Sequence, residues 1–379
     1  MKFTFLSRFS FENWDYRNPF TKGIGGSEVS HIEMSSGLAE KGHDVVSYAP
    51  IPEDLPNKPY RQVEWKSCEK DIDWNRDGIW IIYRALKPLE QLKNTESQKA
   101  NQQIWVVMQD TEIIDAWKPE RLEKIDRLIT LSKEHYNDIC KRYPKIKDKV
   151  VISSNGIRSD LIREIEKKNI VRNPKRIIYA SCPYRGFINV LEIFTRAQEW
   201  IEDLELHIYY GFENIDKYPQ TREVRAMKDA LAKHSKNPAI TFHGRVNQMD
   251  LYEEWFKSGI WLYPTNFTET SCITSMDAQA CGAIPITAPI WALHDNVKFG
   301  AFIQGNIDID PLVKARYVVM LQKFMNLNLQ NDIRPKMMEW ARNYFDWNVF
   351  INQWEGWALE DEKSLKDINE LRKLKDAIK

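Results

Sequence analysis

The chain has 379 residues, a length that predicts two domains, each able to bury its own core. Its 54 Lys and Arg residues balance its 54 Asp and Glu residues, so net charge provides no bulk attraction to nucleic acid or to an anionic membrane. A zero net charge is still compatible with a local basic face on the surface. Hydrophobic residues make up 43% and charged residues 28%, which excludes general disorder and is typical of a soluble globular enzyme.

The sequence contains no pattern typical of membrane insertion or secretion. No apolar run approaches the roughly 18 residues that a membrane span needs. The N-terminal segment reaches Arg8 and Glu12 too early for the apolar core of a signal peptide. The five cysteines are odd in number, are widely spaced and contain no C-x-x-C pair. We therefore expect a reduced, cytoplasmic protein without a structural zinc ion.

Short apolar runs recur along the chain and are separated by longer amphipathic stretches. In the first half the runs are Lys2–Leu6, Val45–Tyr48, Ile79–Tyr83, Ile104–Met108, Leu128–Leu131 and Val150–Ser153. In the second half they are Arg176–Ala180, Glu205–Tyr210, Ala239–His243, Ile260–Tyr263, Ile284–Thr287 and Ala301–Gln304. Most are apolar nearly throughout, as expected for parallel strands buried on both faces.

The stretches between these runs predict helices, because apolar residues recur at helical spacing, for example between Val190 and Ile201. Alternation of strands and helices predicts an α/β protein with two Rossmann-like parallel sheets. We place the domains at residues 1–165 and 166–340, with the polar segment Arg158–Lys175 as the linker. Ligands of such sheets bind beyond the carboxyl ends of the strands.

The pattern after Pro335 is helical and includes four tryptophans. We expect residues 341–379 to form C-terminal helices that return to the N-terminal domain. The last twenty residues predict a charged amphipathic helix with apolar positions at Leu365, Ile368, Leu371 and Leu374. This helix either packs on the domain surface or binds a partner, and both readings stay open.

The first segment that indicates chemistry is the glycine-rich turn Gly23–Glu28, which leads into a predicted helix. Glycines let a ligand approach the backbone, and the start of a helix offers unpaired N–H groups to an anion. The spacing matches neither a dinucleotide-binding G-x-G-x-x-G motif nor a P-loop. A tight corner with no ligand explains this turn equally well.

The segment Tyr263–Pro285 carries more information. A loop with Glu269 follows a strand, and a helix of small residues then runs to Gly282, its expected C-cap. Asp277 lies eight positions after Glu269, about two turns along that helix. Helix N–H groups at Thr270–Ile273 would face an anion, and the two carboxylates could bind hydroxyls, which suits a sugar–diphosphate–ribose ligand. In the alternative reading, one acid is favoured by the helix dipole and the other is solvated.

The chain resembles a family 4 retaining glycosyltransferase of the GT-B fold over almost its whole length. The family's donor signature is E-x7-E followed by a small-residue helix and G-x-P, and this sequence has Glu269, Asp277 and Gly282–Pro285. The subgroup with ETSCITxxEAQAxG followed by ALxxxV is particularly similar, and Ala292–Val297 matches its second element. Other matching segments are Gly23–Glu28, Gly42–Val45, Val151–Ile157, Ile178–Gly186 and Phe242–Val246. The resemblance implies an N-terminal acceptor-side domain and a C-terminal nucleotide-sugar domain that face a cleft.

Catalytic roles follow from the resemblance. Glu269 would hold hydroxyls of the transferred sugar, and Arg185 would contact the diphosphate and stabilise the leaving group. Asp110 corresponds to the acid of a His-Asp pair that is frequent in the family after a strand.

The resemblance also implies a set of donor-binding positions. Asp277 would hold the ribose hydroxyls. Arg245 would assist at the diphosphate, with a surface turn charge as the alternative. Gly25 and Gly26 would close over the phosphates or the acceptor side. The full set of donor-binding positions is Asp277, Gly25, Gly26, Arg245, Thr270, Ser271, Cys272, Ile273 and Ser181.

Two positions depart from the family pattern. Asp277 replaces the second Glu and has a shorter reach, and Gln109 replaces the usual His, which removes a titratable group near the transferred sugar. We assign no general base to His31, His135 or His243, because a lone histidine in such a scaffold is more often a packing residue.

No D-x-D pair follows a predicted strand where it could hold a diphosphate-bound metal. Asp71 and Asp73 have that spacing but lie in a polar stretch. We expect metal-independent catalysis without a cofactor, in which the nucleotide sugar is a co-substrate and basic side chains with a helix dipole neutralise the diphosphate.

The predicted function is transfer of a hexose, with retention, from a nucleoside-diphosphate sugar to an acceptor hydroxyl, most simply on a glycan or glycolipid. A nucleotide-sugar epimerase or hydrolase and a non-catalytic sugar-nucleotide-binding protein remain alternatives. The donor base, the acceptor class and the oligomeric state are not fixed by the sequence. Aromatic residues in the loop Ser7–Lys22 could stack an acceptor ring, including a modified nucleic-acid base, or could pack among themselves; they are Phe11, Trp14, Tyr16 and Phe20.

Overall fold

The computed structural model describes residues 1–8, 10, 12–56, 58–111, 118–213, 215–217 and 219–359. The described chain divides into two compact units. The first comprises Met1–Asn18, Ile24–Gly156 and the described residues from Tyr344 onward, and the second comprises Pro19–Gly23 and Ile157–Asn343. Phe11 and the predicted C-terminal amphipathic helix lie outside the described residues.

The first unit is built on a seven-stranded sheet with the order β3-β2-β1-β4-β5-β6-β7, and every neighbouring pair in it is parallel. Its strands are β1 (Lys2–Leu6), β2 (Asp44–Ala49), β3 (Glu64–Ser67), β4 (Gly78–Tyr83), β5 (Gln102–Val107), β6 (Arg127–Thr130) and β7 (Val150–Ile152). Its helices are α2 (Gly26–Glu40), α3 (Glu96–Asn101), α4 (Pro119–Lys124), α5 (Lys133–Arg142) and α14 (Trp347–Leu359), and α1 (Asn18–Thr21) begins in this unit and continues into the next. Two 3-10 turns, η1 (Lys87–Gln91) and η2 (Pro144–Lys149), complete it.

The second unit is built on a six-stranded sheet with the order β10-β9-β8-β11-β12-β13, again with parallel pairs throughout. Its strands are β8 (Asn173–Ala180), β9 (Glu205–Tyr209), β10 (Ile240–Gly244), β11 (Ser258–Tyr263), β12 (Ile284–Thr287) and β13 (Ala301–Phe302). Its helices are α6 (Ser159–Glu166), α7 (Phe187–Ala197), α8 (Arg222–His234), α9 (Gln248–Lys257), α10 (Ile273–Cys281), α11 (Ala292–Asn296), α12 (Pro311–Phe324) and α13 (Leu327–Tyr344), with 3-10 turns η3 (Pro183–Arg185) and η4 (Ile215–Lys217).

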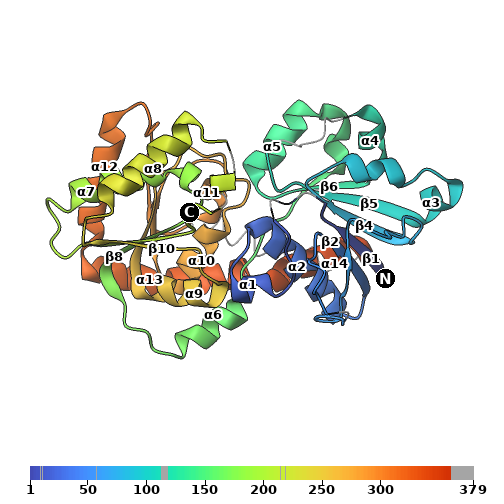
Figure 1. The fold of residues 1–379 in the computed structure, drawn as a ribbon, viewed down its shortest axis with the longest axis horizontal. Coiled ribbons are helices and arrows are strands. Elements are labelled where there is room, and N and C mark those ends of the chain that lie inside the picture. Colours follow the sequence, from blue (N-terminus) through green and yellow to red (C-terminus); the bar gives the residue numbers. More distant parts are fainter. Residues whose placement is uncertain are drawn as a thin grey trace. The chain divides into compact units, whose positions relative to one another are not determined.

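Helices cover each sheet on both faces, as Figure 1 shows for each unit separately. In the second unit α7 packs with α8 and α12, whereas α10 packs with α6 and α9. The central strands are buried because both of their faces are covered; β11 is buried along its whole length. The predicted fold class, two Rossmann-like parallel sheets with C-terminal helices, is confirmed.

The sequence predictions differ from the structure at β3 and at α6, among other elements. Every predicted run coincides with a strand, but β3 (Glu64–Ser67) was missed because its sequence, EWKS, is largely polar and buries fully only Trp65. The prediction that Arg158–Lys175 is a linker is wrong. It contains α6, whose Ile162 and Ile165 are buried, and the start of β8.

The described C-terminal helix α14 packs against α2 in the first unit. Gly37 makes this close approach possible, because a Cβ added there would lie 2.1 Å from Cδ1 of Ile351. The Trp354 indole donates to Oγ of Ser153 at 2.9 Å, and Glu355 accepts from Lys41 at 2.6 Å. The tryptophans of this helix are therefore explained by packing and hydrogen bonding inside the unit.

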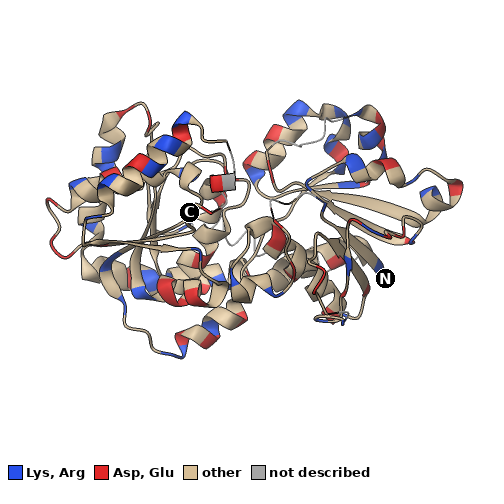
Figure 2. Cartoon of the chain, viewed as in Figure 1, with Lys and Arg blue, Asp and Glu red and all other residues tan. Residues whose placement is uncertain are grey.

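Several of the described helices carry both acidic and basic residues, whereas α2 carries only acids and α12 only basic residues. Figure 2 shows acidic and basic residues interspersed, and α6, α8 and α9 each carry both signs. No helix in the described part of the chain combines the length and hydrophobicity needed to cross a membrane.

Candidate functional site

The carboxyl edge of the second sheet holds an ion pair between two residues predicted to bind the donor. Nη1 of Arg185, in η3 after β8, donates to both carboxylate oxygens of Glu269 at 3.0 Å each. The Tyr263 hydroxyl, at the end of β11, also donates to Glu269, and Oγ of Ser181 lies 3.3 Å from that hydroxyl. Burial, the largest single influence, would lower the pKa of Arg185, but Glu269, together with smaller contributions from Tyr263 and two cysteines, raises the pKa overall. The structure thus brings Ser181, Arg185 and Glu269 together.

The loop that carries Glu269 is fixed by the segment that follows β12. The Glu269 carbonyl accepts from the Ala292 N–H at 3.0 Å, and the Ser271 carbonyl accepts from Nδ2 of Asn296 at 2.8 Å. Gln279 of α10 in turn donates to the Asn296 carbonyl at 2.8 Å. The segment Ala292–Val297, noted in the sequence only as a resemblance, therefore holds the loop that carries Glu269 in place.

Helix α10 starts later than predicted. The N–H groups were expected at Thr270–Ile273, but the helix begins at Ile273 with Cys272 as its N-cap. Cys272 has a φ of 50°, which departs from helical geometry and ends the preceding loop. Thr270 and Ser271 therefore belong to the loop. Burial, followed by the charge of Glu269, raises the pKa of Cys272 to about 12, so this thiol is neutral.

The opposite end of α10 is held by three arginines. Gly282, with a φ of 93°, is the C-cap, as predicted. Nη2 of Arg172 donates to the Cys281 carbonyl at 2.7 Å, Nε of Arg334 to the Gly282 carbonyl at 2.9 Å, and Nε of Arg342 to the Ala280 carbonyl at 2.8 Å. Cations at the C-terminal carbonyls stabilise a helix through its dipole. These contacts make α10 a firm platform for the loop before it.

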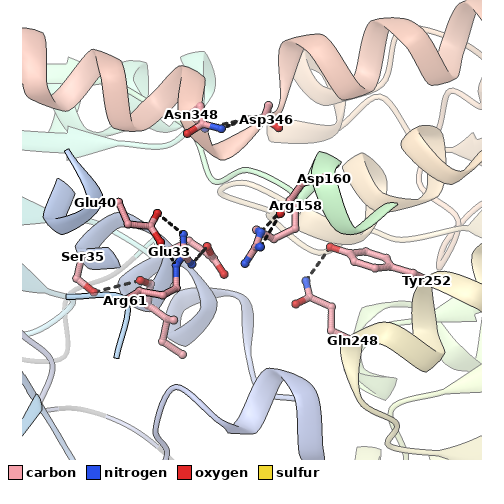
Figure 3. A network of polar contacts seen from close by, with 11 residues as sticks. Glu33, Ser35, Glu40, Arg61, Arg158, Asp160, Gln248, Tyr252, Asp346 and Asn348 are labelled. Atoms are coloured by element: carbon pink, nitrogen blue, oxygen red, sulfur yellow. Dashed lines mark hydrogen bonds and ion pairs between the residues drawn. The ribbon is translucent and has the colours of Figure 1, made fainter. Parts of the chain in front are cut away.

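Asp277, predicted to bind ribose, is buried in the second turn of α10, and its Oδ1 has no hydrogen-bond partner. The Tyr252 hydroxyl accepts from Nε2 of Gln248 at 2.8 Å, the pair drawn in Figure 3. Burial raises the pKa of Asp277 to about 8. The reading of Asp277 as a solvated acid is wrong. An orphaned buried acceptor fits a ligand that supplies a hydroxyl.

Arg245, the remaining basic candidate of the second unit, directly follows β10, where Gly244 has a φ of 70°. It is half-buried.

The predicted glycine turn and Asp110 lie in the first unit. Gly25 is the N-cap of α2 and Gly26 its first residue. A Cβ at Gly25 would lie 2.4 Å from Oε2 of Glu28, so the glycine leaves room for this acid in the first turn of α2. Burial raises the pKa of Glu28 despite the nearby charge of Arg84.

Arg84, which the sequence reading missed, organises this cluster. Its Nε and Nη2 donate to the two carboxylate oxygens of Asp110 at 2.7 and 3.0 Å, and its Nη1 lies 3.5 Å from Oε1 of Glu28. Arg84 directly follows β4 and has a φ of 67°, a strained conformation for a residue with a side chain. A charged residue immediately after an apolar run was the available signal.

Gln109 lies beside this cluster at the position where the family usually has His. Its amide exchanges two hydrogen bonds with the Asn155 amide, at 3.3 and 3.2 Å, and its Nε2 lies 3.4 Å from Oγ of Ser30. The ends of three strands and the first two turns of α2 therefore contribute side chains to two polar clusters that lie side by side along the chain.

The structure does not support acceptor stacking on two of the predicted aromatics. Trp14 is fully buried and packs edge-on against Trp65 and His31. Tyr16 is also buried and stacks on Tyr60 with ring centroids 4.1 Å apart. Phe20 is partly exposed.

His31 and His135 are buried in the first unit, and His243 packs against a tyrosine in the second. Burial lowers the pKa of His31 to about 3 and that of His135 to about 4, and burial also lowers the pKa of His243. His31 bonds to Oγ of Ser47 at 2.6 Å, and His243 stacks on Tyr209. Within the described residues, no group of three His, Cys, Asp or Glu side chains could hold a metal ion.

An ion-pair cluster around Arg61 in the first unit stabilises the packing of a loop on α2. Figure 3 shows Arg61 between Glu33 and Glu40 of α2, with its Nη1 2.6 Å from Glu33 and its Nε 2.6 Å from Glu40. These contacts tie the segment before β3 to α2.

Solved structures with a similar fold identify the fold of this chain. No protein-family model matches the chain, and no curated protein matches its sequence. Sucrose-phosphate synthase from Thermosynechococcus elongatus matches with a TM-score of 0.70 at 12% identity, covering 95% of this chain and 98% of that one. The fold is GT-B.

Two further structures agree with this fold. A glycosyltransferase from Rickettsia africae has a TM-score of 0.64 at 12% identity and 98% coverage of both chains. Anabaena HepE in complex with UDP and glucose has a TM-score of 0.64 at 13% identity, covering 95% of this chain and 99% of that one. At such identities the likeness concerns the fold, and membership of family 4 stays a prediction.

Proposed function

We propose that the protein is a glycosyltransferase that moves a hexose, with retention of configuration, from a nucleoside-diphosphate sugar to an acceptor hydroxyl. The observation that carries the proposal is the Arg185–Glu269 pair at the carboxyl edge of the second sheet, next to the start of α10. A cation, a carboxylate and a helix N-terminus are the groups that a sugar diphosphate needs.

The roles follow from the chemistry of each group. Arg185, with the N–H groups at the start of α10, stabilises the negative charge that develops on the departing diphosphate. Glu269 accepts hydrogen bonds from hydroxyls of the transferred sugar, and Asp277 accepts from the ribose. The acceptor oxygen attacks the face from which the diphosphate leaves, its proton passes to the departing diphosphate, and no stable covalent intermediate forms. Cationic groups replace a metal ion in this scheme.

Uridine diphosphate hexoses are the first donors to test. Anabaena HepE was solved with UDP and glucose, and a pneumococcal O-GlcNAc transferase with a TM-score of 0.56 and 14% identity was solved with UDP and GlcNAc. A glycan or glycolipid hydroxyl is the proposed acceptor, and a modified nucleic-acid base is the alternative to include in a screen.

The test is a screen of UDP-, GDP- and ADP-glucose, with release of nucleoside diphosphate as the readout and NMR to assign the anomer of the product. We expect one donor to be consumed in an acceptor-dependent way with an α-linked product, and Glu269→Ala to abolish turnover with an unchanged circular-dichroism spectrum. Consumption of donor with no acceptor dependence would favour a hydrolase or an epimerase. Donor binding with no release of diphosphate would indicate a non-catalytic binding protein.

A further inference from the structure

Arg185 has a buried side and an exposed side. Its Nη1 is engaged by Glu269, and its guanidinium lies 4.4 Å from the centre of the Phe267 ring. The side chain remains 36% exposed. The structure therefore leaves part of the Arg185 side chain accessible to an anionic ligand while Nη1 is paired with Glu269.

Glu269 depends on that single cation. Its side chain is only 4% exposed, and Arg185 is the only cation bonded to it among the residues that the structure describes. Its other side-chain partner is the neutral hydroxyl of Tyr263. A buried carboxylate that loses its counter-ion is destabilised unless another donor replaces it.

A diphosphate that binds Arg185 must share this guanidinium with Glu269. Two negative groups then compete for one cation, and the closeness of the carboxylate opposes the binding of phosphate. A nucleotide sugar compensates, because hydroxyls of its sugar donate to Glu269. A nucleoside diphosphate lacks the transferred sugar and therefore the hydroxyls that would donate to Glu269, since its ribose hydroxyls are assigned to Asp277.

We propose that Glu269 discriminates between the nucleotide sugar and the nucleoside diphosphate by competing with the diphosphate for Arg185. This inference rests on the proposed function. Once the sugar has been transferred, Glu269 loses its hydroxyl partners, takes back the guanidinium and weakens the binding of the diphosphate product. The pair thereby favours exchange of product for fresh donor.

The test is calorimetric titration of the full chain with UDP and, separately, with UDP-glucose. We expect Glu269→Gln to bind UDP about tenfold more tightly than the wild type, because the competing charge is removed, and to bind UDP-glucose no more tightly. Glu269→Ala removes the same charge without adding an amide and should also bind UDP more tightly. Melting temperatures establish that each variant is folded.

Two further variants assign the effect to the pair. In an Arg185→Gln background, Glu269→Gln should no longer tighten UDP binding, because the contested cation is gone. Glu254→Gln is the matched control, since Glu254 also accepts from an arginine (Arg176) and from a tyrosine hydroxyl (Tyr209) in the same unit. It should leave UDP binding unchanged.

The outcomes separate the two proposals. If wild-type protein binds none of UDP, GDP, ADP or their glucose derivatives, the proposed function fails. If the wild type binds one of these pairs and both Glu269 variants bind the diphosphate equally or more weakly, the competition is refuted and the proposed function stands. GDP or ADP replaces UDP in the titrations if the wild type selects that base.

Discussion

Each sheet carries an arginine–carboxylate pair at the carboxyl ends of its strands, and the two pairs have opposite exposure. In the second unit the Arg185 side chain is 36% exposed and Glu269 only 4%. In the first unit Arg84 is 12% exposed and Asp110 is 39%. The second unit therefore presents a cation to solvent and the first presents a carboxylate. An exposed cation suits an anionic diphosphate, and an exposed carboxylate suits a hydroxyl group that donates to it. The two similar pairs are therefore suited to different ligands.

After the loss of turnover expected for Glu269→Ala, the next largest effect is expected at the exposed cation. Arg185→Ala should lower turnover by roughly 10²- to 10³-fold, because stabilisation of the leaving diphosphate is lost. Arg185→Lys keeps the charge but not the planar guanidinium, so its turnover should lie between that of the wild type and that of Arg185→Ala. Initial rates of diphosphate release measure both. Full turnover of Arg185→Ala would remove the cation from the mechanism.

A smaller effect is expected at the exposed carboxylate. Asp110→Asn should lower turnover by roughly tenfold, and Arg84→Gln should do the same because Arg84 holds Asp110 in place. The double variant should lose little more than either single variant. Arg76→Gln is the matched control, since Arg76 pairs with Asp44 at 2.8 Å and lies two residues before β4, the strand that Arg84 follows. Additive losses in the double variant would show that Arg84 acts independently of Asp110.

The last prediction concerns the pH dependence of stability, which we expect to depend on Asp277. The pKa of Asp277 is raised to about 8 in the folded protein, so the native state holds a proton that the unfolded chain releases above about pH 4. Stability contributed by this group is therefore present at low pH and is lost as pH rises toward 8, by up to about 4 kcal/mol at neutral pH. The melting temperature of wild type should fall between pH 5 and pH 8 by more than that of Asp277→Asn. Equal falls would mean that Asp277 does not titrate in this range.

The sequence predicted the strands well because the central strands are buried on both faces and consequently apolar throughout. It did not predict β3 and α6, because both are largely polar in sequence and bury only a few side chains, such as Trp65 and Ile162. The positions of Glu269 and Asp277 around the start of α10 followed from the loop and helix signals, although the helix starts at Ile273.

The contacts that define the site could not be read from the sequence. Arg185 and Glu269 are 84 positions apart and meet only because β8 and β11 are neighbours in the sheet. Arg84 and Asp110 likewise meet through the pairing of β4 and β5. The burial of Trp14 depends on packing against β3, the strand that was missed.

The most direct measurement is a crystal structure of the protein with UDP. We predict a phosphate oxygen within about 3 Å of the Arg185 guanidinium, with the ribose at Asp277. A nucleotide bound elsewhere, with Arg185 still occupied by Glu269 alone, would contradict the account.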